Sequence, residues 1–163
     1  MANFCAVRVN ETHLFVAGGQ DAFLLEWATA TWTPLPPMRY SRSSHACGVA
    51  RNPTKVVVVG GDTYPADAAD TVEIFDLRFE EWSLGPWLPD AFKLTDATTV
   101  AYGDSFILLG GWSASGASDK VYEFDPVNNE WFLRPEELKI GRSNTVAFAV
   151  PESLIVGENK NLY

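Results

Sequence analysis

At 163 residues, with 47% hydrophobic and 13% aromatic side chains, the chain is long enough to bury a core, and its composition excludes intrinsic disorder. Its formal net charge of −9 opposes binding to nucleic acid and to anionic membrane surfaces, and favours a basic or neutral protein segment as partner. The N-terminus lacks the pattern of a signal peptide, and no apolar run approaches the roughly 20 residues that span a bilayer, so we expect a soluble, cytoplasmic protein.

The chain repeats one set of landmarks three times in a fixed order. A pair of glycines ends an apolar run, and an apolar residue followed by an acid comes seven residues before a tryptophan. The three tryptophans lie 50 and 49 residues apart. The landmarks are Gly18-Gly19, Leu25-Glu26 and Trp32, then Gly60-Gly61, Phe75-Asp76 and Trp82, then Gly110-Gly111, Phe124-Asp125 and Trp131. A constant period of this length predicts a repeat architecture.

Four short runs in the second repeat predict four β-strands. They lie at 44–50, at 55–59, at 71–76, and from Trp82 to about Gly85-Pro86, with turn residues between them. No segment has a helical period of useful length. Four-stranded units repeated at this spacing predict a β-propeller, an all-β fold whose blades pack face to face around an axis. A tryptophan once per blade is large enough to fill the wedge between neighbouring blades, so we expect the glycine pairs and these indoles to be structural.

Taken together, the apolar strand, the Gly-Gly pair, the variable loop, the aromatic–acid pair and the tryptophan resemble Kelch repeats over essentially the whole chain. The resemblance implies four-stranded antiparallel blades in which the first strand lines the central channel and the fourth lies outermost. We expect blade 1 at 3–37, blade 2 at 42–88, blade 3 at 94–138 and a half blade at 142–163, with strands at 142–150 and 153–156.

Three blades and a half fall short of a closed ring, since propellers typically have about four to eight blades. Either the chain is a piece of a longer protein or strands from a partner complete it. An open array exposes a strand edge at each end, which is a template for pairing. One hypothesis is a head-to-tail dimer in which two such halves form a seven-blade ring.

The cysteines and histidines offer little for chemistry. Cys5 and Cys47 each lie 13 residues before the first glycine of their pair, so we expect equivalent positions on adjacent inner strands, separated by more than the roughly 7 Å that a disulfide allows. Two reduced, buried thiols would suit a reducing compartment. His13 falls in a turn and His45 at the start of an inner strand, where we expect it to line the channel. We therefore predict no metal site, no cofactor and no catalytic residue.

The loops at one rim are the candidate binding surface. The loop after the glycine pair is short in blade 1 and long in blades 2 and 3, and length change confined to one class of loop is typical of a binding surface. In Kelch adaptors the residue after Gly-Gly and an Arg-Ser pair entering the next blade face the ligand. By resemblance, and from the long loop of blade 2, the partner-binding residues are Gln20, Arg42, Ser43, Asp62, Tyr64, Trp112, Arg142 and Ser143.

Two alternatives stay open at this rim. Trp112 either anchors a partner or folds back over its own blade, and Arg42 and Arg142 either contact the ligand or make a structural bond to the neighbouring loop. Blade 3 has Phe92-Lys93-Leu94-Thr95 in place of the Arg-Ser pair, which leaves a gap in the ring of basic residues.

The favoured function is a non-enzymatic protein-interaction module. The resemblance implies substrate recognition for a ubiquitin-ligase adaptor or a cytoskeletal scaffold, with self-association as a further possibility. The alternative is an enzyme or small-metabolite binder with a site at the channel mouth, and a third hypothesis is a fragment without independent activity.

Overall fold

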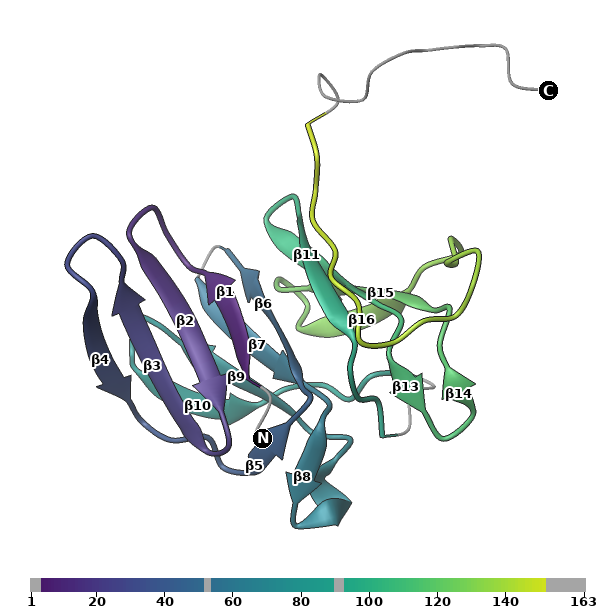
Figure 1. The fold of residues 1–163 in the computed structure, drawn as a ribbon, viewed down its shortest axis with the longest axis horizontal. Coiled ribbons are helices and arrows are strands. Elements are labelled where there is room, and N and C mark those ends of the chain that lie inside the picture. The colour runs from purple at the N-terminus through teal and green to yellow at the C-terminus, as the bar shows by residue number, and fades with distance from the viewer. Residues whose placement is uncertain (1–3, 52–53, 90–92, 152–163) are drawn as a thin grey trace.

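The chain folds into three antiparallel four-stranded sheets that follow one another in sequence (Figure 1). The computed structural model describes residues 4–51, 54–89 and 93–151. Blade 1 consists of β1 (Cys5–Arg8), β2 (His13–Gly18), β3 (Asp21–Glu26) and β4 (Thr31–Leu35); blade 2 of β6 (Ala46–Ala50), β7 (Lys55–Val59), β9 (Val72–Asp76) and β10 (Glu81–Leu84); blade 3 of β11 (Thr98–Tyr102), β12 (Ser105–Leu109), β15 (Val121–Asp125) and β16 (Glu130–Leu133).

Two short two-stranded sheets complete the set of elements. β5 (Ser41–Ser43) pairs with β8 (Asp62–Tyr64), and β13 (Trp112–Ser113) pairs with β14 (Gly116–Ala117). The only helix among the described residues is the 3-10 turn η1 (Ala66–Ala68), and no helix in that part of the chain is long and apolar enough to cross a bilayer. The predicted all-β array of four-stranded blades is confirmed, and it is open at both ends.

Each blade buries both faces of its strands where a neighbour covers them. We call the face turned toward the preceding blade the leading face and the face turned toward the following blade the trailing face. In β7, Val56 and Val58 point to the leading side and pack with blade 1, whereas Val57 and Val59 point to the trailing side and pack with blade 3. A strand covered on both faces reads as a continuous apolar run, which is why β7 is uninterrupted valine after Lys55.

The repeated tryptophans lie on the leading faces and link each blade to the one before it. The Trp82 indole N–H donates to the Pro36 carbonyl at 2.7 Å, and the Trp131 indole N–H donates to the Pro86 carbonyl at 3.1 Å. Trp131 is only 7% exposed, but Trp32 is 53% exposed because no blade precedes it among the described residues. The wedge role therefore holds for the two tryptophans that have a preceding blade.

Peptide groups tie the inner ends of the blades together. The Asp96 N–H donates to the Ser44 carbonyl and the Asn144 N–H donates to the Asp96 carbonyl, each at 2.8 Å. All three residues have positive φ, between 53° and 55°, so the chain turns in the same way at each point. Serine, aspartate and asparagine are suited to this left-handed conformation because their short polar side chains bond locally.

Cys5 and Cys47 form a disulfide with a Cα–Cα distance of 5.9 Å, so the expectation of two separate, reduced thiols is wrong. The cause is a register difference. Cys5 pairs with Ala17, one residue before the first glycine, whereas Cys47 pairs with Val58, two residues before it. The residue just before the glycine pair lies opposite Cys5, 12 residues earlier, in blade 1, but opposite Ala46, 13 residues earlier, in blade 2. The hairpin that joins the first two strands is thus one residue shorter in blade 1, and a one-residue slip turns a side chain to the other face. Cys5 thus faces blade 2, Cys47 faces blade 1, and the disulfide removes the reason for inferring a reducing compartment.

The expected inner strand of a fourth blade at 142–150 is not a strand in the structure. The segment makes the backbone contacts that lead into such a blade, including the bond from Asn144, but residues 145–151 have no assigned strand and point away from the sheets (Figure 1). A strand is held by a ladder to its neighbour, and the second strand expected at 153–156 lies outside the described residues.

Candidate partner-binding rim

The short sheet β5–β8 forms one wall of a hollow at the rim between blades 1 and 2. Figure 1 shows this sheet and the β13–β14 hairpin projecting from the same side of the array. Ser43 lies opposite Asp62, and Ser41 lies opposite Tyr64. The hollow has a volume of about 480 Å³ and is lined by Gly19, Ser41, Arg42, Ser43, Asp62, Thr63 and Tyr64. Three predicted rim residues, Ser43, Asp62 and Tyr64, therefore come together in one place.

Gly61 allows the chain to reach this rim. Its φ of +88° lies in a region that side-chain-bearing residues rarely adopt, and a Cβ there would collide with the Ser43 carbonyl and the His45 side chain. The loop that follows carries Tyr64 into solvent, where its side chain is 83% exposed. Asp62 is also exposed and forms no ion pair within the described part of the chain. An aromatic ring and a free carboxylate are thus presented together.

Arg42 lines the hollow with its backbone, because its side chain is buried. The guanidinium donates to the Gly60 carbonyl at 2.8 Å, to Thr71 at 3.0 Å and to the Glu73 carboxylate at 2.8 Å, and both charged side chains are almost fully excluded from solvent. The Glu73 carboxylate also accepts the backbone N–H of Arg39 at 2.7 Å. The prediction that the Arg42 side chain contacts a partner is corrected: this arginine is a structural bond between the linker and blade 2.

The linker into blade 3 packs on its blade without an ion pair. Leu94 occupies the position of Arg42, since each linker residue accepts the N–H of the second glycine of the preceding blade. Tyr122 occupies the position of Glu73, as the second residue of the third strand. Leu94 and Tyr122 are both buried in the core between blades 2 and 3. Where blade 3 lacks the Arg-Ser pair, two residues of the apolar core therefore take the positions of the Arg42–Glu73 ion pair.

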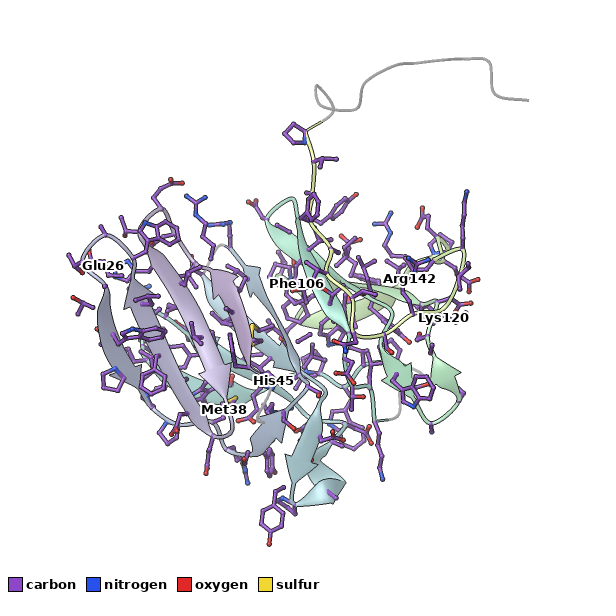
Figure 2. The ribbon with its side chains drawn as sticks, in the orientation of Figure 1. Glu26, Met38, His45, Phe106, Lys120 and Arg142 are labelled. Carbon is purple, nitrogen blue, oxygen red and sulfur yellow. A yellow bond between two sulfur atoms is a disulfide. The ribbon has the colours of Figure 1, made fainter. Side chains whose placement is uncertain are left out.

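Gln20 secures the linker that leads into the hollow. Its side-chain amide donates to the Met38 carbonyl at 2.8 Å, and the Met38 N–H donates to the Gln20 carbonyl at 2.8 Å. The Met38 side chain is buried between blades 1 and 2 (Figure 2). Gln20 itself is exposed, so it borders the rim while it fixes the linker.

The other predicted rim residues lie on blade 3 and its exit linker. Trp112 is 55% exposed, and its backbone bonds with Thr95 in both directions at 2.7 and 2.8 Å. Arg142 is exposed, and its Nε donates only to the nearby Ile140 carbonyl at 3.1 Å (Figure 2). Ser143 follows it and is half-buried. Lys120, in the adjacent loop, pairs with Glu137 and Asp119, so its charge is already neutralised.

His45 is buried beside the rim, in the contact between blades 1 and 2. His45 is 6% exposed, and its Nε2 lies 3.2 Å from the Ala17 carbonyl, which can only accept, so Nε2 carries the proton. Burial, and then the Arg42 charge, lower the pKa of His45 to about 4. His45 is thus a neutral side chain in the contact between blades 1 and 2. Within the described ranges no three His, Cys, Asp or Glu side chains cluster around a common point.

Comparison with known proteins shows the family. The model of the Kelch motif matches residues 43–86 and 93–136, more than half of the chain. The chain belongs to the Kelch-repeat family. The two matches coincide with blades 2 and 3 of the structure.

Similar curated proteins are Kelch-repeat proteins of different kinds. An F-box/kelch-repeat protein of Arabidopsis thaliana is 29% identical over 69% of this chain and 28% of its own length. Kelch-like protein 7 of Mus musculus is 27% identical over 78% of this chain and 20% of its own length, and alpha-scruin of Limulus polyphemus is 25% identical over 69% and 13%. The chain thus spans between 13% and 28% of these relatives.

A solved structure supports the fold. The protein YjhT superimposes with a TM-score of 0.60 at 17% identity, over 81% of this chain and 52% of that protein. Identity at this level carries information about the fold alone, and it agrees with the array of four-stranded blades.

Proposed function

We propose that this Kelch array binds a protein segment through the rim formed by the β5–β8 hollow and the β13–β14 hairpin. The observation that supports the proposal most directly is the hollow of about 480 Å³, where Asp62 and Tyr64 stand exposed beside Ser43. The buried bonds of Arg42 hold the floor of the hollow and the bonds of Gln20 hold the linker, so the exposed groups sit on a rigid base.

The chemistry of the rim favours a basic or neutral segment with an apolar anchor. Tyr64 and Trp112 are large aromatic side chains with most of their surface in solvent, and such residues are enriched among those that dominate binding energy. Asp62 adds a carboxylate without an ion-pair partner among the described residues, and the chain as a whole carries −9. Complementary charge raises the association rate and excludes acidic competitors.

The names of the relatives support binding rather than catalysis as the function. The F-box/kelch-repeat proteins combine Kelch repeats with an F-box, as their name indicates. We propose the same use of this array, as the recognition part of an adaptor or of a scaffold. The blade boundaries that go with this proposal are 3–37, 42–88 and 94–138.

The proposal is tested by comparing exposed aromatic residues at opposite ends of the blades. Proteins captured by the full chain are quantified by mass spectrometry for wild type, Tyr64→Ala, Trp112→Ala and the control Phe79→Ala. Phe79 is 63% exposed in the turn between β9 and β10, away from the rim. Loss of the same captured protein in both rim variants, with retention in the control, is expected. Equal capture by all four proteins would exclude this rim.

We also propose that the open array associates with another copy of itself. Its two end sheets each leave one face without a covering blade among the described residues, and exposed faces of this kind promote pairing.

A further inference from the structure

The two strands of the β5–β8 sheet turn one face into the hollow at the rim. Directly opposite residues of an antiparallel pair point to the same side, and so do residues two apart on one strand. Asp62 and Tyr64 of β8 therefore share a face with their partners Ser43 and Ser41 of β5. All four line the hollow of about 480 Å³, and we call them the hollow face. Arg42 lies at the intervening position, so its side chain takes the opposite face and is buried.

The hollow carries one uncompensated negative charge. Arg42 is the other charged residue on its lining, and Glu73 neutralises it at 2.8 Å. His45 lies against Gly61 and adds no charge near neutral pH, since burial and then the Arg42 charge lower its pKa to about 4. The Asp62 carboxylate has no ion-pair partner among the described residues. The hollow therefore favours a cation over an anion or a neutral group.

The placement of Asp62 and Tyr64 suits a planar cation. Residues two apart on a strand are separated by about 6.5 Å, and the Tyr64 side chain is 83% exposed, so its ring is accessible. A guanidinium can donate two parallel hydrogen bonds to a carboxylate and also stack on an aromatic ring, whereas an ammonium is a compact, strongly hydrated point charge. The half-buried hydroxyls of Ser41 and Ser43 supply acceptors for the remaining guanidinium N–H groups.

We infer that the hollow face binds an arginine side chain of the partner protein, with the guanidinium paired to the Asp62 carboxylate and stacked on the Tyr64 ring. This inference rests on the rim binding proposed above, and it names the side chain that the hollow receives.

Trp112 lies on the next step of the rim. The Gly61 N–H donates to the Leu94 carbonyl at 2.8 Å, and the next residue, Thr95, exchanges two backbone bonds with Trp112 at 2.7 and 2.8 Å. These contacts connect Asp62, which follows Gly61, to the exposed indole of blade 3. A segment whose arginine occupies the hollow can therefore place a nearby apolar residue against Trp112.

Titration of the full chain with capped amino acids, followed by NMR, tests the inference. The probe is Nα-acetyl-arginine amide, and its matched control is Nα-acetyl-citrulline amide, which has nearly the same shape without the charge. The arginine probe should give saturable shifts of the backbone amide signals of Ser43, Asp62 and Tyr64, with a dissociation constant in the millimolar range. The citrulline probe should not saturate, and Nα-acetyl-lysine amide should bind less tightly than arginine. No saturable shift with arginine, or equal binding of citrulline or lysine, would overturn the inference.

Variants of the hollow face assign the contacts. Asp62→Asn keeps the size of the side chain and should raise the dissociation constant of the arginine probe by about 5-fold or more, since it removes the charged acceptor. Tyr64→Ala should raise it by about 2- to 5-fold, whereas Tyr64→Phe keeps the ring and should bind like wild type. The matched control is Asp104→Asn, since Asp104 is also exposed but lies in the β11–β12 turn at the other end of the blade. Equal probe binding by Asp62→Asn and Asp104→Asn would contradict the assigned pairing.

Failure of this inference is separable from failure of rim binding. In the capture experiment above, an excess of the arginine probe should release the protein that Tyr64→Ala and Trp112→Ala fail to capture, and the citrulline probe should not. Capture that depends on both aromatic residues but survives the arginine probe and Asp62→Asn would support rim binding and refute the arginine site. Probe binding in the hollow without any captured protein that depends on the rim would support the site and contradict the rim as a protein-binding surface.

Discussion

Arg42 and Glu73 form an ion pair over 2.8 Å inside the contact between the first linker and blade 2, with both side chains out of solvent. A pair of this kind is costly to break from one side, because the remaining charge stays buried without a partner. The next linker uses Leu94 and Tyr122 at the same two positions. The same two positions are thus occupied by an ion pair at blade 2 and by apolar packing at blade 3.

Removing one partner should destabilise the fold strongly, whereas exchanging both should restore much of the loss. Arg42→Leu or Glu73→Gln is expected to lower the free energy of unfolding by about 3–5 kcal/mol. The double variant Arg42→Leu with Glu73→Tyr copies blade 3 and should be more stable than Arg42→Leu alone. Urea unfolding gives the comparison, with Arg8→Leu as control, since the Arg8–Glu11 pair is exposed and its loss should cost less than about 1 kcal/mol. A double variant no better than the single one would contradict the equivalence.

The disulfide between Cys5 and Cys47 should stabilise the chain by restricting its unfolded state. The two residues are 42 apart in sequence, and a closure of this kind typically contributes about 2–4 kcal/mol. Reductant should lower the free energy of unfolding of the wild type, measured by urea titration, by that amount, and should leave that of a Cys5→Ala, Cys47→Ala double variant unchanged. Two titratable thiols in the native, unreduced protein would show that the disulfide is not formed.

Gly48 is required by the ring of Phe106, which packs directly against its backbone from blade 3. A Cβ at this position would overlap the ring, and the Phe106 side chain is only 1% exposed, so it has no room to move. Gly48→Ala is expected to cost about 1–3 kcal/mol by overpacking. Combining it with Phe106→Leu should cost less than the sum of the two single changes in a double-mutant cycle. Strict additivity would mean that the two residues do not compete for space.

Protonation of His45 should weaken the fold at acidic pH. The pKa of His45 is lowered to about 4 in the folded chain, from 6.5, so between these values the unfolded chain binds the proton and the folded chain does not. Above pH 6.5 His45 is neutral in both the folded and the unfolded chain, so the stability is fully present. As the pH falls from 6.5 toward 4, only the unfolded chain gains the proton, and the free energy of unfolding decreases. His45→Ala copies Ala97, its counterpart in blade 3, and should reduce the slope of unfolding free energy against pH in this window. An unchanged slope would place the acid sensitivity elsewhere.

The strand pattern follows from the sequence because short-range signals determine it. The run at 55–59 matches β7 at both ends, and the expected third strand at 71–76 differs from β9 by one residue. Valine runs, glycine pairs and turn residues act locally, so their consequences can be predicted without the tertiary contacts. The four-residue spacing of Trp82 and Pro86 can also be found in the sequence. That the Trp82 indole bonds to Pro36 of the preceding blade depends on how the blades pack, so the sequence pattern alone does not predict it.

The wrong predictions concern side chains whose direction depends on strand register or on burial. Counting to the glycine pair makes Cys5 and Cys47 equivalent, but the hairpin of blade 1 is one residue shorter than that of blade 2, which turns the two side chains toward each other. Arg42 has the composition of a surface ligand contact, and only the acid at Glu73, 31 residues later, shows that the guanidinium turns inward. Tyr64 and Asp62 lie at the rim as expected, since a loop between fixed strands must leave the sheet at its end.

The contacts from Asp96 to Ser44 and from Asn144 to Asp96 use only main-chain atoms. The spacing of the blades around the axis is therefore kept by groups that every amino acid except proline possesses. A substitution at any of these three points keeps the main-chain bond, provided that the new residue tolerates the left-handed turn. Repeats can thus diverge in sequence, and acquire different rim loops, while the radius of the array stays the same.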